Sequence, residues 1–140
     1  MIEDRTQGLV ASELQAQLRD LLALAVVGDH VRWVLTGDES GQLTDWLADA
    51  VPRWRALADR VAMHLVKLGV APDGRVRSLV EDIPLNWVPE GWLHPDEARR
   101  LVSDRLSVLA GWAYYRRSQV ADPDTVRLLD AVCEGLERSP

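Results

Sequence analysis

The sequence predicts an all-α protein built as a bundle of four helices. Apolar residues recur at spacings of three and four along four long segments, which is the pattern of amphipathic helices. No segment shows the strict alternation of apolar and polar residues that predicts a half-buried strand. Apolar residues make up 47% of the 140-residue chain and charged residues 27%, the balance of an ordinary globular protein. We therefore expect a single domain over residues 1–140.

The first helix is predicted over residues 6–36. Gly37 follows it, where a residue with positive φ commonly ends a helix. The turn Gly-Asp-Glu-Ser-Gly then separates this helix from the next one. The apolar stripe of the first helix comprises Leu14, Leu18, Leu21, Leu22, Ala25 and Trp33.

The second helix is predicted to end at Gly69, and its stripe is the longest in the chain. Pro52 interrupts it, because a proline inside a helix removes one amide donor and clashes with the preceding turn, at about 3 kcal/mol. We expect a kink or a restarted helix there. The stripe comprises Leu43, Leu47, Val51, Trp54, Leu57, Ala58, Val61, Leu65 and Leu68.

Residues 70–95 are rich in proline and predict a long crossover with a short helix over 75–83. The third long helix begins at Pro95, a residue favoured at the first helical position. The fourth begins after Asp122, a capping residue, with Pro123 at its first position. The two stripes are Ala98, Leu101, Val102, Leu109, Trp112 and Tyr115, and Val126, Leu129, Val132, Cys133 and Leu136.

The lengths of the connections predict the topology. The first and second helices are joined by a short turn, as are the third and fourth, so each pair should form an antiparallel hairpin. The long middle connection must then carry the chain back along the bundle. Two hairpins joined by one long crossover make the ferritin-like topology.

Three motifs in this frame resemble the Dps branch of the ferritin-like superfamily, the miniferritins. They are Arg-Trp-Val-Leu-Thr-Gly at 32–37, the segment from Ala58 to Gly74 that contains Ala-Asp-Arg-Val-Ala and Leu-Gly, and the acidic helix start at 94–98. The resemblance covers about residues 10–135 and runs without a gap from Trp33 to Leu68. It implies a bundle that self-associates through dimers into a hollow shell, usually a dodecamer. Members of that family oxidise ferrous iron at a site shared across the dimer interface and store the mineral in the shell.

The iron-ligand positions of that pattern fall on Arg32, Thr44, Ala48 and Pro52. Arginine carries a permanent positive charge and only donors, so it repels a cation. Alanine and proline have no ligand atom, and threonine is a weak ligand beside carboxylates and imidazoles. We therefore expect a cage protein, related by family to iron storage or stress protection, without a conventional ferroxidase centre. No cofactor is predicted, iron is implied by the resemblance alone, and the sequence leans against an enzyme.

Two interpretations remain for the residues around the former iron site. Arg32 needs a counter-charge, either a carboxylate of a neighbouring subunit or a bound anion. Trp33, Trp46 and Trp54 either pack in the core and the dimer interface or, with Arg32, line a ligand pocket. If Arg32 binds an anion and the tryptophans line a pocket with it, the protein has an alternative function, that of a non-catalytic ligand-binding protein. An enzyme with a relocated metal site is a third hypothesis.

Charge and composition limit the remaining function classes. The net charge of −6 argues against a general nucleic-acid binder, so DNA is not a partner that the charge supports. No stretch reaches the length of about 20 apolar residues needed to span a membrane. Cys133, the single cysteine, excludes an internal disulfide and fits a reducing compartment. We expect a cytoplasmic protein in which Cys133 is buried and Asp45 and Asp49 are solvated.

Overall fold

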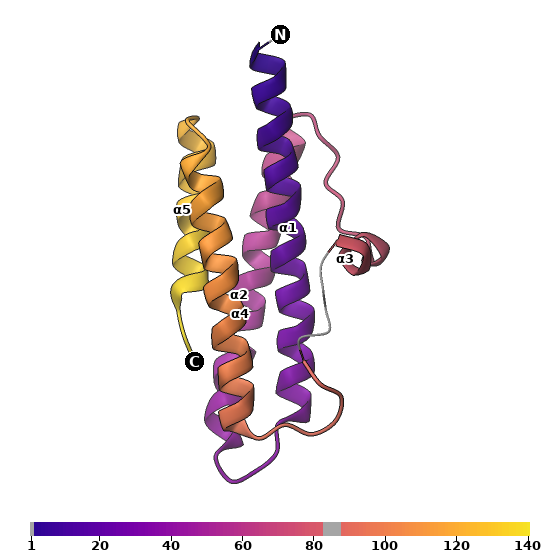
Figure 1. Cartoon of the computed structure of the whole chain (residues 1–140), viewed down its shortest axis with the longest axis vertical. Helices are drawn as coiled ribbons and strands as arrows, with labels where there is room; N and C mark the ends of the chain where they lie inside the picture. The colour runs from indigo at the N-terminus through magenta and orange to yellow at the C-terminus, as the bar shows by residue number, and fades with distance from the viewer. Residues whose placement is uncertain (1, 83–87) are drawn as a thin grey trace.

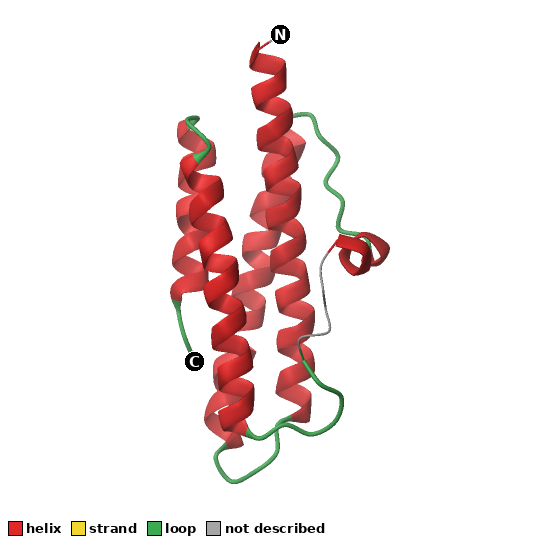
Figure 2. Cartoon of the chain, in the orientation of Figure 1, coloured by secondary structure: helices red, strands yellow, loops and turns green. Residues whose placement is uncertain are grey.

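The computed structural model describes residues 2–82 and 88–140, and its regular elements are helices (Figures 1 and 2). The prediction of an all-α ferritin-like bundle is confirmed. Trp87 and the end of the predicted short helix, Ile83, lie outside the described residues. The helices are α1 (Ile2–Val34), α2 (Ser40–Lys67), α3 (Val76–Asp82), α4 (Pro95–Ser118) and α5 (Pro123–Glu137).

The four long helices form two antiparallel hairpins that pack side by side. Helices α1 and α2 form one hairpin and α4 and α5 the other, with α1 against α4 and α2 against α5 (Figure 1). The crossover returns along the outer side of α1, where the short helix α3 packs. This is the topology that the connection lengths predicted.

Helix α1 ends at Val34, two residues earlier than predicted. The Thr36 amide donates to the Leu93 carbonyl at 2.9 Å, and the Leu93 amide donates to the Val34 carbonyl at 2.9 Å. The end of the crossover thus takes up backbone groups that a longer helix would have used. Gly37 follows with φ of +113°, as its position predicted.

Helix α2 continues through Pro52 as one helix, so of the two predicted alternatives, a kink or a restart, the restart does not occur. Pro52 is exposed, and so is Ala48, whose carbonyl would otherwise accept from residue 52. Water can therefore satisfy that carbonyl, which lowers the cost of the missing amide.

The core follows the predicted stripes except at two places. Trp33 is 65% exposed, and Trp112 and Tyr115 are 52% and 50% exposed. The inward positions at the end of α4 are Ala113 and Arg116, which continue the spacing of three and four from Leu109. The predicted stripe includes Trp112 and Tyr115 because they are apolar. The buried face of α4 instead includes Arg116.

Helices α1 and α2 approach closely at Gly28. A Cβ atom at this position would lie 2.8 Å from Val51 Cγ2 and 2.9 Å from Trp54 Cζ3. Both contacts are shorter than carbon atoms tolerate, so the absence of a side chain at Gly28 lets Val51 and Trp54, which is 1% exposed, pack this close to α1.

A hydrogen-bonded chain joins the end of α2 to the start of α5. The Thr125 amide and hydroxyl both donate to the Asp122 carboxylate, at 3.0 and 2.9 Å, so Asp122 is the predicted N-cap. His64 Nε2 lies 2.8 Å from the Thr125 hydroxyl oxygen. Because the hydroxyl proton goes to Asp122, His64 Nε2 must be the donor.

Gln15 fastens the first part of the crossover to α1. The Gln15 side chain donates to the Ala71 carbonyl at 2.9 Å and accepts from the Asp73 amide at 2.9 Å. Asp73 in turn accepts hydrogen bonds from Arg75 and from the Ser78 hydroxyl, at 2.9 and 2.6 Å. These bonds, that from Arg75 first, hold the pKa of Asp73 far below its usual range. They place the predicted short helix, α3, beside α1.

Replacing Gly28 by alanine should destabilise the fold by about 1–3 kcal/mol, because the added methyl group overpacks the seam. Urea unfolding followed by far-UV circular dichroism measures the change at fixed protein concentration. Gly111→Ala is the matched control, since Gly111 is an exposed helical residue with open space around it. That control should be more stable than the wild type by about 0.5–1 kcal/mol. Equal effects at both sites would contradict the close seam.

The Asp122 cap should make stability depend on pH in the acid range. Its pKa lies below the ordinary aspartate value, chiefly because the carboxylate accepts the Thr125 backbone amide. The cap therefore contributes fully above the unfolded-state pKa, and its contribution is lost as pH falls through the lower folded-state pKa. The stability gap between wild type and Asp122→Ala should close below that point. In Asp122→Asn, which caps without titrating, the advantage over alanine should persist in acid.

Candidate functional site

The four former iron-ligand positions do not form a ligand cluster. Thr44 donates its hydroxyl hydrogen bond to the Ser40 carbonyl of its own helix at 2.9 Å. Ala48 and Pro52 are exposed on α2, and Arg32 is half-buried near the end of α1. Only Arg32 among the four brings a charge to this region.

Arg32 pairs with a carboxylate of its own helix. Its Nη2 donates to Asp29 Oδ1 at 3.0 Å, and Arg55 Nη2 from α2 donates to Asp29 Oδ2 at 3.3 Å. The sequence reasoning missed Asp29 and Arg55. The spacing of three between Asp29 and Arg32 is a signal that could have identified the first pair. Arg55 is 26 residues away from Asp29, and only the fold brings them together.

Arg32, Asp29 and Arg55 form a triad with two positive charges and one negative charge. One carboxylate serves two guanidinium groups, and each of its oxygens accepts from one of them. Arg32 Nε is buried and has no hydrogen-bond partner among the described residues. A buried N–H without an acceptor is costly, so this atom marks an incomplete site.

A hollow of about 570 Å³ opens beside the triad, between α1 and the end of the crossover. Trp33 stands in it largely exposed, with the Arg32 guanidinium 5.9 Å from the centre of its ring, a cation–π contact. The residues that line the hollow are Val26, Val27, Asp29, His30, Trp33, Arg55, Val88, Pro89 and Glu90.

The structure does not bring the three candidate tryptophans into one pocket. Trp54 is buried in the core, and Trp46 packs against it edge to face with ring centroids 6.0 Å apart. Trp46 borders a different hollow from Trp33. Trp92, in the crossover, is 75% exposed, and the neighbouring Leu93 is the residue that pins the crossover to the bundle.

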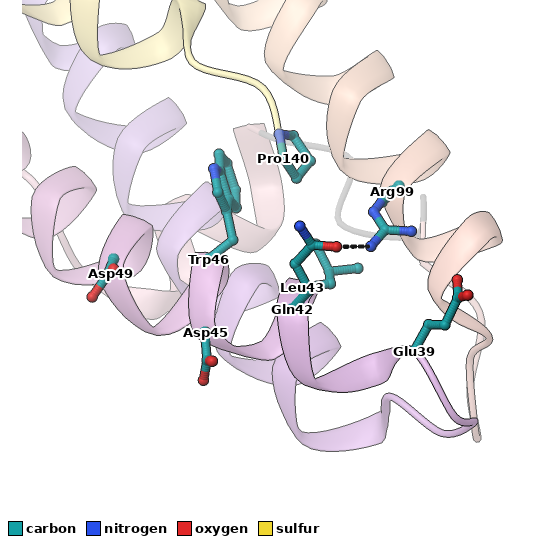
Figure 3. A pocket seen from close by; sticks show the side chains of 8 residues that line it. All are labelled: Glu39, Gln42, Leu43, Asp45, Trp46, Asp49, Arg99 and Pro140. Atoms are coloured by element: carbon teal, nitrogen blue, oxygen red, sulfur yellow. Dashed lines mark hydrogen bonds between the residues drawn. The ribbon is translucent and has the colours of Figure 1, made fainter.

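The hollow at Trp46 has about 440 Å³ and lies between the first turns of α2 and α4 and Pro140 (Figure 3). Gln42 and Arg99 point toward each other across it, with 3.5 Å between Arg99 Nη2 and Gln42 Oε1. Asp45 and Asp49 are exposed at its edge, which confirms that they are surface carboxylates.

The three histidines and the cysteine lie in different parts of the fold. His30 lines the hollow at Trp33, His64 bonds to Thr125, and His94 precedes the first turn of α4. Within residues 2–82 and 88–140, no three histidine, cysteine or acidic side chains lie close enough together to hold a metal ion. Cys133 is buried, as predicted, and burial raises the pKa of its thiol.

A second charged cluster is buried between α1 and α4. Arg116 is 6% exposed and donates to Asp20 at 2.8 Å, to Gln17 at 3.0 Å and to Glu13 at 3.3 Å. Gln17 is fully buried, and its Nε2 has no acceptor in the described part of the chain. The cluster fastens the two hairpins to each other across the bundle.

Comparison with known sequences finds one partial match. No protein-family model matches the chain. The chain is 34% identical over 76 residues to the fine tangled pili major subunit of Haemophilus ducreyi, a match that spans 54% of this chain and 40% of that protein. None of the helices in the described ranges is long and apolar enough to cross a membrane.

Solved structures of Dps proteins superpose on nearly the whole chain. Dps92 of Deinococcus radiodurans has a TM-score of 0.90 at 24% identity, covering 95% of this chain and 82% of that one. Mycobacterium smegmatis Dps has a TM-score of 0.90 at 21% identity, with coverage of 96% and 82%. Microbacterium arborescens Dps, in its high iron form, has a TM-score of 0.88 at 19% identity, with coverage of 94% and 88%. The chain therefore has the fold of the Dps miniferritins, as the sequence motifs predicted.

Arg116→Met should lower the free energy of unfolding by about 3–5 kcal/mol, because it leaves the Asp20 carboxylate buried without a counter-charge. Adding Asp20→Leu to the same chain should restore most of the loss, since both buried charges are then gone. Arg117→Met, at the exposed pair with Asp130, should change stability little. Chemical denaturation of the four proteins measures these differences. A loss at Arg116 no larger than that at Arg117 would mean that the cluster does not hold the hairpins.

Proposed function

We propose that this chain is the subunit of an oligomeric Dps-type cage that lacks a conventional ferroxidase centre. The observation that carries the proposal is the superposition of nearly the whole chain on Dps subunits with TM-scores of about 0.9. A subunit with that backbone fold can place its helices as those subunits do, which is the basis for proposing that it also self-associates. The name of the Haemophilus ducreyi relative also describes the subunit of a polymer.

Unpartnered apolar side chains support self-association. Several large ones lie open on the isolated chain, which is costly for a protein that stays monomeric. On α1 and α3 they are Val26, Trp33, Val76 and Val80, and on α4 they are Val108, Trp112 and Tyr115. A second copy of the chain is the partner that would cover them. Whether the assembly stops at a dimer or continues to a dodecamer is what the measurement below decides.

The chemistry of Arg32 is the reason for proposing a cage without ferroxidase activity. A site that oxidises ferrous iron needs anionic or neutral oxygen and nitrogen ligands. Among the positions that the family resemblance assigns to iron ligands, Arg32 offers only a positive charge, and the nearby carboxylate of Asp29 is already shared between Arg32 and Arg55. The family role that remains is protection or storage inside a cytoplasmic shell.

A second candidate function is ligand binding at the same place. The specific observation in its favour is the hollow beside Trp33, which combines apolar walls with the Asp29–Arg55 pair. Concave sites of this size that join apolar walls to a few polar groups commonly bind small molecules. Trp33 lines this candidate site, Arg32 adjoins it through its contacts with Asp29 and the Trp33 ring, and Trp46 and Trp54 do not line it.

Light scattering coupled to gel filtration should give a mass that is a multiple of the 15.7 kDa chain, up to twelve copies. The same sample should oxidise ferrous iron no faster than buffer, as followed by absorbance. A Dps protein that carries the family's iron ligands is the positive control. A monomer at micromolar concentration would refute the cage, and oxidation well above buffer would refute the loss of the ferroxidase centre.

A further inference from the structure

The short helix α3 depends on other parts of the chain for its position. With seven residues it is too short to be stable alone, since isolated helices need about 12–15 residues. Among the helices of the described ranges, α3 packs on α1 alone. Its inward side chains are Ser78 and Leu79, and Leu79 packs with Ala23 and Leu22 of α1 in a small cluster separate from the main core. Apolar packing therefore contributes little to holding α3 in place.

Gln15 of α1 supplies the polar part of that attachment. Its Nε2 donates to the Ala71 carbonyl and its Oε1 accepts from the Asp73 amide, both at 2.9 Å. The Asp73 carboxylate then accepts from the Ser78 hydroxyl at 2.6 Å. One hydrogen-bonded path thus runs from α1 through Gln15 and Asp73 into α3, which lies on the outer side of α1 (Figure 1). A change at Gln15 cuts this path where it leaves α1.

The outward face of α3 is apolar. Val76 and Val80 are 74% and 62% exposed, and their spacing of four places them on one face of the helix. Val26, which is 48% exposed, follows Leu22 by one turn of α1, and Leu22 is the residue that packs with Leu79. Helix α3 thus adds two valines to the apolar side of α1 on which Val26 lies, and the place of these valines depends on where α3 is held.

The charges beside these valines identify a second copy of the chain as the partner. Arg77 and Glu81 are exposed on α3, one turn apart, and each follows one of the valines directly. Neither forms an ion pair within the described ranges, and Arg75, a cation that acts on Glu81, is already bonded to Asp73. Two α3 helices that meet antiparallel about a two-fold axis would place Arg77 of each copy opposite Glu81 of the other. The surface is therefore its own complement.

We propose that Gln15 is a positioning residue for self-association, because it holds α3 where this helix docks against α3 of a second copy. The inference rests on the proposed function only in that the chain self-associates, whether as a dimer or as a larger cage. It adds which helix makes a contact and which side chain sets the position of that helix. Gln15 itself needs no contact with the second copy.

The variant Gln15→Ala tests the positioning on the full chain. Loss of two hydrogen bonds should loosen residues 71–82, which hydrogen–deuterium exchange detects as faster amide exchange there. Amides in the core of α2 and α4 should keep their protection. Self-association, measured by analytical ultracentrifugation over a dilution series, should weaken about tenfold. Gln7→Ala is the matched control, because Gln7 is an exposed glutamine of α1 outside this network, and it should change neither measurement.

The variant Arg77→Glu tests the identity of the partner. It puts a carboxylate opposite Glu81 at two equivalent places, so it should weaken self-association about tenfold, since each exposed pair contributes modestly. Adding Glu81→Arg to the same chain re-forms both pairs with the charges exchanged. The double variant should therefore associate as the wild type does, and amide exchange in α3 should be unchanged in both variants.

Three results would overturn the inference. They are a loosening of residues 71–82 by Gln15→Ala with no change in assembly, a weaker assembly with no loosening, and a double variant that associates no better than Arg77→Glu. Each of them, found with an assembled wild type, refutes the α3 contact and leaves the cage standing. A monomeric wild type at micromolar concentration instead refutes the self-association on which both proposals rest.

Discussion

The close approach of α1 and α2 at Gly28 is the constraint on which the rest of the structure depends. Because no side chain separates the two helices there, Val51 and Trp54 pack directly on the α1 backbone. Asp29 is the next residue along α1, and Arg55 is the next along α2. The ion pair between them therefore lies at the edge of the seam, where the helix spacing is fixed by core packing. The geometry of the candidate site is a consequence of how the core is closed.

Much of the fold could be predicted because its signals are local. The helix starts at Pro95 and Pro123, the Asp122 cap and the glycines after α1 and α2 are set by neighbouring residues. The predicted helix ends and breaks differ from the structure where tertiary contacts or solvent exposure determine the course of the helix. Helix α1 ends early because Leu93, far along the chain, takes its last backbone groups, and α2 passes Pro52 because that residue faces water.

The composition of the core likewise depends partly on local sequence pattern and partly on distant contacts. Counting tryptophan and tyrosine as interior residues placed Trp112 and Tyr115 inside, while the buried face of α4 continues to Arg116 and meets Gln17 of α1. A sequence pattern cannot reveal that a charged residue is interior, because its burial depends on partners 96 to 103 residues away. Once Glu13 and Asp20 surround the guanidinium, the arginine is a tolerable core residue, and its specific hydrogen bonds fix how the hairpins meet.

The sequence predicted that arginine and tryptophan side chains would form the candidate site, but it did not predict most of the residues that line it. Arg32 and Trp33 stand out in the sequence, and the spacing of three could have added Asp29, but Arg55 and the crossover wall join them only through the fold. Trp46 borders another hollow, and Trp54 is buried in the core. What unites the site is a reversal of charge. A set of carboxylates and imidazoles needs a cation to be stable when close together, whereas here Arg32 and Arg55 are paired with the carboxylate of Asp29. The apolar contact between α1 and α2 at Gly28 does not depend on the charges at the site. A fold held by Gly28, Val51 and Trp54 can therefore keep its shape while the charged residues at the site change, because the packing that positions the site does not depend on them.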